Sequence, residues 1–245
     1  TNLFATDYYI VSGAGSSEVN GTYVEEDGAY SGKPQYAFSS YRIRYVNNEW
    51  AIMYPSDMPD YIYYTNPATT DTPPVTGWVK GDHGDLPVPD VTKPMVLEYN
   101  TNLSAGTTIE LPLYGNTVDV TVDWGDGNTD TYTSYGKKSH TYSADGTYTV
   151  TIEGSLSQYG ATSTCDGVEA LTKVISFGDI GLTKLRYAFY NATNLSEVPP
   201  TLPASITSLN SCFAGTDAVS FPNLNNWNFS NVTDMGGMFW NNANF

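Results

Sequence analysis

LTKLRYAF at residues 182–189, ITSLNSCF at residues 206–213 and VTDMGGMF at residues 232–239 repeat one pattern in the last third of the chain. Each segment reads apolar, Thr, any residue, apolar, two further residues, a small or apolar residue, and Phe. The spacing is 24 residues from Phe189 to Phe213 and 26 residues from Phe213 to Phe239. A period in this range predicts a short solenoid in which each repeat is one stacked turn of chain.

The repeated apolar positions predict the core of this solenoid. The residues that we expect in two stacked apolar columns are Leu185, Leu209 and Met235 in one and Phe189, Phe213 and Phe239 in the other. Burial of each side chain is expected to contribute about 1.5–3 kcal/mol, and the Thr and Asn residues between them can satisfy backbone groups at the bends. Terminal repeats normally carry a polar cap, yet Met238, Phe239 and Phe245 are apolar. We therefore expect that the solenoid continues beyond residue 245 or that a neighbouring chain covers its open edge.

Four further aromatic residues of the repeat block are candidates for a recognition surface, namely Tyr187, Tyr190, Trp227 and Trp240. Aromatic side chains provide a large contact area at a low cost in conformational entropy. Each of them, taken alone, can equally be a packing residue. A solenoid displays a surface and need not house a reaction, so the repeats favour a binding function.

The charge balance is strongly acidic, with 26 Asp and Glu against 10 Lys and Arg and a formal net charge of −16. Nucleic-acid binding needs basic residues that neutralise phosphates, and anionic membrane surfaces also attract basic segments. We therefore expect no nucleic-acid partner. Because no apolar run approaches the roughly 20 residues of a membrane span, we expect no membrane insertion.

The composition favours strands, because 20 Tyr accompany many Thr, while 22 Gly and 14 Pro supply turns. We predict a mainly β fold. Of the two cysteines, Cys212 stands at the small-residue position of the second repeat, which predicts a buried filler. A bridge to Cys165 needs closely spaced Cα atoms, and this alternative stays open. No signal peptide is visible, which indicates a removed leader or release by another route, such as lysis within a virus particle.

Three parts are expected along the chain. Residues 1–90 read as a small β domain for anchoring or docking, with hairpin signals at Asn20-Gly21 and Asp27-Gly28. Residues 84–94 contain three prolines and predict a stiff, extended spacer. Residues 95–160 form a second β unit, and residues 165–245 form the repeats.

The second β unit carries VDWGDG at residues 122–127, HTY at residues 140–142 and GTYTV at residues 146–150. Gly125 and Gly127 permit a tight turn after Trp124, Asp126 can accept hydrogen bonds from turn amides, and His140 can pack back against the turn. As a set, these motifs resemble the polycystic-kidney-disease (PKD) type of Ig-like domain over about residues 95–155. The resemblance implies an Ig-like β-sandwich.

The third repeat, NFSNVTDMGGMF at residues 228–239, is similar to the leucine-rich repeats of BspA-like bacterial surface proteins. The first two repeats match this pattern more loosely, and the similarity covers about residues 165–245. It implies an exported or particle-borne interaction protein and brings no catalytic residues. The N-terminal part resembles small modules of phage tail or fibre proteins.

No constellation of residues points to catalysis. Asp119, Asp123, Asp126 and Asp130 surround the Trp124 turn, but calcium needs six to eight oxygen ligands, and the pattern favours turn and solvent-facing acids. His83 and His140 lack the further ligands that zinc requires. No nucleophile elbow and no phosphate-binding loop occur. We assign no catalytic, cofactor-binding or metal-binding residue and expect no enzyme.

The sequence leaves three functional hypotheses. The first is a structural or display protein of a virus particle, a phage fibre or capsid decoration protein, with other virion or surface proteins as partners and as a homo-oligomer. The second is a bacterial cell-surface adhesin that binds a host-surface protein or glycan. The third is a carbohydrate-binding module or glycan-active enzyme with Trp50, Trp78 or Trp227 as sugar platforms, although Trp50 and Trp78 favour core positions.

Overall fold

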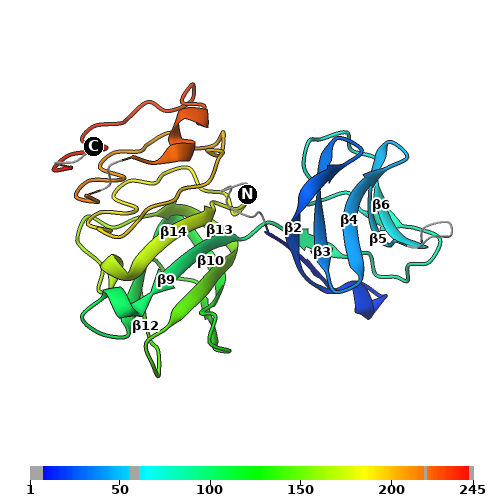
Figure 1. Ribbon diagram of the computed structural model, residues 1–245, viewed down its shortest axis with the longest axis horizontal. Helices are drawn as coiled ribbons and strands as arrows, with labels where there is room; N and C mark the ends of the chain where they lie inside the picture. Colours follow the sequence, from blue (N-terminus) through cyan, green and yellow to red (C-terminus); the bar gives the residue numbers. More distant parts are fainter. Residues whose placement is uncertain (1–7, 56–60, 218–219, 243–245) are drawn as a thin grey trace. The chain divides into compact units, whose positions relative to one another are not determined.

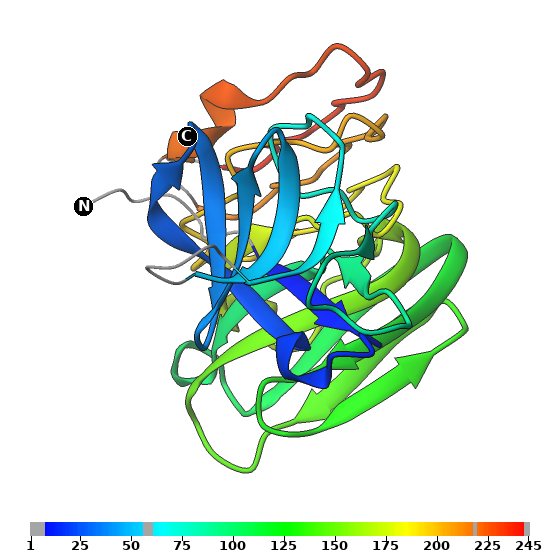
Figure 2. The same ribbon diagram turned by 90° about the vertical axis from the view of Figure 1, so that its right-hand side faces the viewer.

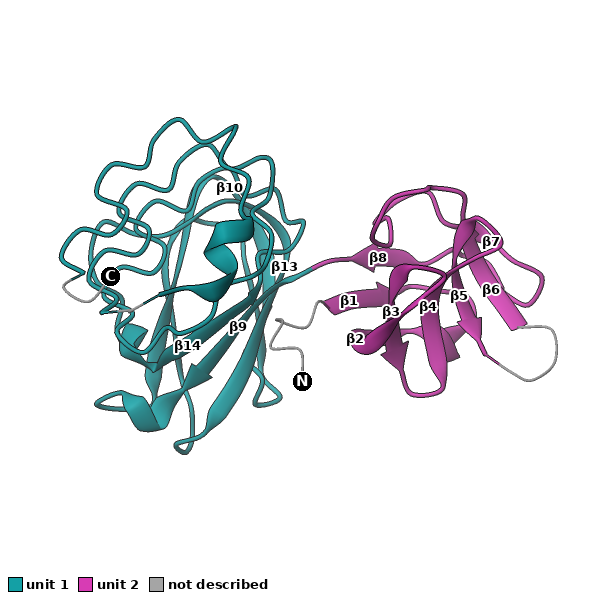
Figure 3. Ribbon diagram, turned by 45° about the horizontal axis from the view of Figure 1, so that its top comes forward, with its two compact units in different colours: residues 1–5, 94–245 teal, residues 6–93 magenta. Residues whose placement is uncertain are grey.

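The computed structural model of the chain describes residues 8–55, 61–217 and 220–242 (Figure 1). Strands dominate, as the composition predicts, and the few helices are short 3-10 turns. The chain divides into two compact units, which we call the first unit (residues 8–93) and the second unit (residues 94–242) (Figure 3). Phe245, part of the expected open edge, lies outside the described residues.

The first unit is one antiparallel sheet of eight strands in the order β7-β6-β5-β4-β3-β2-β1-β8. Its elements are β1 (Tyr8–Ser12), η1 (Ser17–Val19), β2 (Gly21–Tyr30), β3 (Lys33–Phe38), β4 (Tyr41–Val46), β5 (Glu49–Tyr54), β6 (Tyr61–Asn66), β7 (Val79–Lys80) and β8 (Asp90–Thr92). Trp50 and Trp78 are buried in or against its core, and their indole N–H groups donate to the carbonyls of Thr70 and Pro74 at 3.2 and 2.9 Å. These two tryptophans are core anchors, so the sugar-platform role considered for them is wrong.

The proline-rich stretch at residues 84–94 is not a free spacer. Residues Asp90–Thr92 form β8, which pairs with β1 at the edge of the first sheet. The N–H of Gly15 donates to the carbonyl of Pro87 at 2.8 Å, and the hydroxyl of Tyr64 donates to the carbonyl of Asp85. Proline lacks an N–H group but keeps its carbonyl, and here that carbonyl ties the stretch to the first unit.

The second unit contains a curled antiparallel sheet in the order β11-β10-β13-β9-β14, with β12 also paired to β10 (Figure 1). Its elements are β9 (Met95–Asn100), η2 (Thr101–Leu103), β10 (Thr108–Asp123), β11 (Thr129–Tyr132), β12 (Gly136–Thr141), β13 (Thr147–Tyr159), η3 (Val168–Ala170), β14 (Leu171–Ser176) and η4 (Pro222–Asn226). The long strand β10 pairs with β12 through its first half and with β11 through its last residues. A register shift between Tyr114 and Val118 separates these halves.

After β14 the chain forms three coils, the first at residues 182–192, the second at residues 206–216 and the third at residues 232–242. Single parallel bridges join Lys184 to Ser208 and Ser208 to Asp234. Every second N–H donates to the next coil, so those of Leu185, Tyr187, Phe189 and Asn191 reach the carbonyls of Ser208, Asn210, Cys212 and Ala214 at 2.9–3.0 Å. Figures 1 and 2 show the coils lying one above another, from yellow to red, beyond the end of the green sheet.

The threonine of each repeat has a fixed role in this stacking. The N–H and Oγ1 of Thr207 both donate to the carbonyl of Thr183, at 2.8 and 3.2 Å. Thr233 donates in the same way to Thr207 at 2.9 and 3.2 Å. Thr183 makes the equivalent bonds, both at 3.0 Å, to the carbonyl of Ser157 in β13. The end of β13 therefore takes the place of a preceding coil.

The two apolar columns are buried in the first and second coils and partly exposed in the third coil. Leu185, Leu209, Phe189 and Phe213 are fully buried, and the Phe213 ring stacks 5.5 Å from Phe189 and 5.8 Å from Phe239. Met235, expected in the core, is 48% exposed, so this expectation is wrong. Its counterpart Leu209 is covered by the third coil, whereas no coil of the described residues covers Met235.

The sheet and the coils share one hydrophobic core, which runs from Met95 in β9 to Met238 in the third coil. The boundary expected between residues 160 and 165 falls inside this second unit. Cys165 and Cys212 are both buried free thiols, which answers the question of a bridge between them. Cys212 is the buried filler that the repeat pattern predicts.

Replacement of Phe213 by alanine tests the column. We expect Phe213→Ala to lower the free energy of unfolding of the second unit by about 3–5 kcal/mol, because it leaves a cavity between two stacked rings. Phe239→Ala, at the half-buried end of the same column, is the matched control and should cost clearly less. Differential scanning calorimetry of the full chain measures both changes, and equal losses would contradict the stacking.

Candidate interaction surface

The four aromatic candidates of the repeat block differ in how far their side chains are exposed to solvent. Trp227 is buried, its indole N–H donates to the carbonyl of Pro199 at 2.8 Å, and its ring contacts Phe177 and Phe213. The prediction of Trp227 as a recognition residue is therefore wrong. Trp240 on the third coil is 65% exposed. Tyr187 and Tyr190 on the first coil are half-buried, so part of each ring faces solvent.

Tyr187 has an unusual backbone conformation for a bulky residue. Its φ is +55°, in the left-handed region, and the equivalent residues Ser211 and Gly237 have φ values of +53° and +62°. This region costs an L-residue roughly 1–2 kcal/mol, and aromatic residues rarely adopt it. The coil geometry imposes the conformation, and the later coils meet it with small residues. Tyr187 instead places a large ring at this position.

A second left-handed position follows four residues later in each coil, at Asn191, Gly215 and Asn241. Asn and Gly tolerate this conformation best. The recurrence of these residue types two positions after each Phe is a signal that the repeat pattern offered and that our prediction did not use.

Tyr187 and Tyr190 belong to a cluster on the first coil. Their rings meet edge to face with centroids 5.8 Å apart, and the guanidinium of Arg186 lies 5.5 Å from the Tyr187 ring. Lys184 is exposed two residues earlier on the same outward side, since Leu185 between the two cations points into the core. We call Lys184, Arg186, Tyr187 and Tyr190 the basic aromatic patch.

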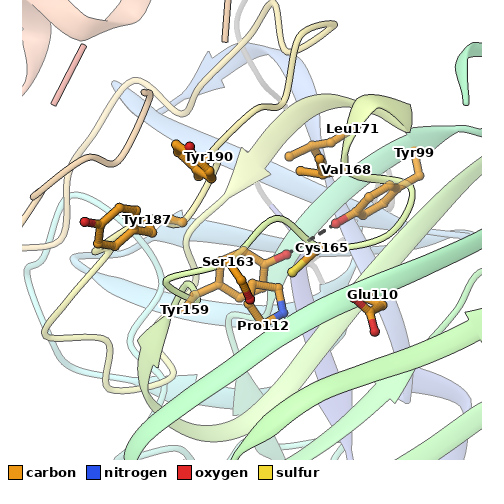
Figure 4. A pocket seen from close by; sticks show the side chains of 11 residues that line it. Tyr99, Glu110, Pro112, Tyr159, Ser163, Cys165, Val168, Leu171, Tyr187 and Tyr190 are labelled. Atoms are coloured by element: carbon orange, nitrogen blue, oxygen red, sulfur yellow. Dashed lines mark hydrogen bonds between the residues drawn. The ribbon is translucent and has the colours of Figure 1, made fainter. Parts of the chain in front are cut away.

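The cavity beside this patch is very small. Tyr187 and Tyr190 line a cavity together with Tyr159 and Cys165, and Figure 4 shows their side chains around it. Its volume of about 10 Å³ accommodates at most about one water molecule. Burial raises the pKa of the Cys165 thiol to about 11, so this thiol stays protonated at neutral pH and is a poor nucleophile. The cavity offers no room for a substrate.

The Trp124 turn brings its predicted residues together. His140 Nε2 lies 2.8 Å from Asp126 Oδ2, and the His140 ring stacks on Trp124 with centroids 4.7 Å apart. The hydroxyl of Tyr142 donates to the carbonyl of Trp124 at 2.9 Å. This geometry confirms that the segment from His140 to Tyr142 packs back on the turn.

The acids around Trp124 are used by the turn itself. Asp130 accepts a hydrogen bond from the Trp124 indole N–H at 2.8 Å, and Asp123 accepts one from the N–H of Gly125 at 2.8 Å. Gly125 has a φ of +79°, and a Cβ there would lie 2.4 Å from the carbonyl oxygen of Thr149. Gly127, with a φ of +92°, continues the turn. These contacts give the turn a structural role.

The remaining chemical sites considered from the sequence find no geometric support. Within residues 8–55, 61–217 and 220–242, no group of three or more His, Cys, Asp or Glu is placed to hold a metal ion. Among the helices in the described part of the chain, none has the length and hydropathy that a membrane crossing requires.

Comparison with known proteins finds one family that matches the repeats. Residues 176–245 match a family described as "Mycoplasma protein of unknown function, DUF285". This match covers all three coils and agrees loosely with the resemblance to BspA-like bacterial surface repeats. No curated protein and no solved structure matches the chain significantly. Neither the PKD-type nor the phage-module resemblance is matched by a family.

Two substitutions test the conformational strain at Tyr187. Tyr187→Asn removes the ring and relieves the left-handed conformation, which asparagine accepts. Tyr190→Asn removes the partner ring, and Tyr190 has no positive φ to relieve. We expect urea unfolding to show Tyr187→Asn more stable than Tyr190→Asn by about 1–2 kcal/mol. Equal stabilities, or the opposite order, would contradict the strain.

The Asp126–His140 contact predicts a dependence of stability on pH. Partial burial raises the pKa of Asp126, but hydrogen bonds from His140 and Asn128 outweigh this effect and hold the pKa below the ordinary value of 3.8. Because the folded pKa is the lower one, this stabilisation is complete above the unfolded pKa and is lost as the pH falls through the folded pKa. Melting curves of wild type and Asp126→Asn should therefore converge below about pH 3.8. A constant difference between pH 7 and pH 3 would contradict this account.

Proposed function

We propose that this chain is a non-enzymatic display protein of a bacterial cell surface, in which the three coils form a short solenoid that presents a recognition surface. The match of residues 176–245 to a Mycoplasma family supports the bacterial setting. The observation that carries the proposal is the construction of the coils. Their backbone groups and apolar side chains are used in stacking, while Tyr187, Tyr190 and Trp240 keep ring surface toward solvent.

The geometry of the second unit supports binding in preference to catalysis. The cavity lined by Tyr187 and Tyr190 is too small for a substrate, its cysteine is held as a thiol, and the His140–Asp126 pair is used in the packing of a turn. A rigid stack seated on a sheet is a suitable carrier for a binding surface, because its contact residues are held by main-chain hydrogen bonds.

The alternative of a virion protein rests on the N-terminal likeness to phage modules. The repeat match favours the adhesin hypothesis over it. A glycan function based on Trp50, Trp78 or Trp227 loses its support, because all three side chains are buried. A glycan can contact only residues that reach solvent, such as those of the basic aromatic patch.

Surface labelling of intact producing cells tests the proposed location. A membrane-impermeant amine-reactive biotin should label this chain on intact cells, because Lys80 and Lys184 are exposed. A cytoplasmic protein of the same cells, labelled only after lysis, is the control. Labelling of this chain only after lysis would overturn the proposal. Recovery of the chain in purified phage particles would also overturn it, in favour of the virion alternative.

A further inference from the structure

The two cations of the basic aromatic patch stand out in an acidic chain. Lys184 and Arg186 are the only basic residues after Lys173 in a chain of net charge −16. Both are exposed, and neither forms an ion pair with any of the described residues. Two like charges without an ion-pair partner, beside two partly exposed aromatic rings, form an arrangement that attracts an anionic group.

One acid of the coils, Asp234, lies close enough to Arg186 for that charge to add to the hydrogen bond from Asn210 in lowering its pKa, but it forms no ion pair with Arg186. Asp234 on the third coil accepts hydrogen bonds from Asn210 Nδ2 at 3.1 Å, Ser208 Oγ at 3.2 Å and the N–H of Gly236 at 3.1 Å. Its oxygens are therefore used in holding the second and third coils together. The guanidinium of Arg186 retains its donors for a group from outside the chain.

The backbone at the patch is also occupied. The N–H groups of Leu185, Tyr187 and Phe189 donate to the second coil. A peptide that binds by strand addition needs a run of free main-chain groups, and the N–H groups of these three residues are not free. We therefore look to the side chains of the patch for ligand contacts.

The side chains next to the two cations offer surfaces that suit a sugar ring. Tyr187 and Tyr190 offer ring surface, and the N–H of Tyr187 donates to the carbonyl of Asn210 at 2.9 Å, which places that residue alongside. Asn210 and its neighbour Ser211 are half-buried, and Ser211 Oγ donates to Asn210 Oδ1 at 3.3 Å. The Asn210 amide is thus bonded on both sides, since its Nδ2 donates to Asp234 Oδ1 at 3.1 Å, and it frames the strip on which the cations and the aromatic rings lie. On that strip the tyrosine rings offer apolar faces to a sugar, and the arginine fork suits a carboxylate or sulfate.

The conformation of Tyr187 supports a functional role for this strip. Local backbone strain is concentrated at functional sites, and the coil geometry places a bulky ring in the left-handed region at Tyr187, where the third coil has Gly237. We propose that the basic aromatic patch binds an anionic glycan, with Arg186 and Lys184 on the carboxylate or sulfate and Tyr187 and Tyr190 against the sugar rings. This inference rests on the proposed display function and specifies its ligand.

Binding of the full chain to immobilised heparin and polysialic acid tests the inference and separates sulfate from carboxylate. Surface plasmon resonance should show binding to at least one of them, weakened by salt, and none to neutral dextran. Arg186→Gln and Tyr187→Asn should each weaken binding at least about tenfold, the scale of an important interface contact. Lys80→Gln, which removes an exposed lysine of the first unit, is the matched charge control and should bind as wild type.

The outcomes distinguish this inference from the proposed display function on which it rests. Wild-type binding by Arg186→Gln and Tyr187→Asn, or no binding to either glycan, would overturn the patch as a glycan site. Equal or tighter binding to polyglutamate would replace the glycan with an acidic peptide and overturn it too. If surface labelling succeeds while these binding results fail, the display function stands and only the ligand assignment falls.

Discussion

The hydrogen-bonded packing of the first coil against the end of β13 is the interaction on which the fold of the second unit depends. The carbonyl of Ser157 accepts both the N–H and the hydroxyl of Thr183, and the N–H of Tyr159 donates to the carbonyl of Lys184 at 3.2 Å. Gly160 permits this approach, because a Cβ there would lie 2.1 Å from the carbonyl oxygen of Arg186. Repeats cannot bury their apolar faces alone, so the sheet supplies the surface that starts the stack.

The same seating determines what the coils can display. Once the first coil is fixed, its alternate N–H groups fix the second coil, and the second fixes the third. Two left-handed positions per coil follow from this geometry. Gly237 adopts the first of these conformations at low cost, whereas Tyr187 adopts it with a bulky side chain and places a ring beside Arg186 and Tyr190. Fold and proposed binding surface thus have one physical origin.

Much of this arrangement could be predicted from the sequence where the cause is local or periodic. The repeat spacing identifies the positions of Thr207 and Phe213, and the motif around Trp124 identifies its contact with His140. Distant partners could not be predicted. The spacing does not show that β13 lies under the first coil, that Trp227 reaches the carbonyl of Pro199 28 residues away, or that residues Asp90–Thr92 pair with β1. Met235 shows the same limit, because its burial depends on a neighbouring coil and not on its own residue type.

Amide hydrogen exchange of the full chain tests the central claim, that sheet and coils form one cooperative unit. The account predicts that the amides of Val150 and Ile152 in β13 and those of Leu185 and Leu209 in the coils share one opening free energy and lose protection together as urea is added. Coil amides that exchange freely while β13 remains protected would contradict it, because the coils would then open without the sheet on which they are seated.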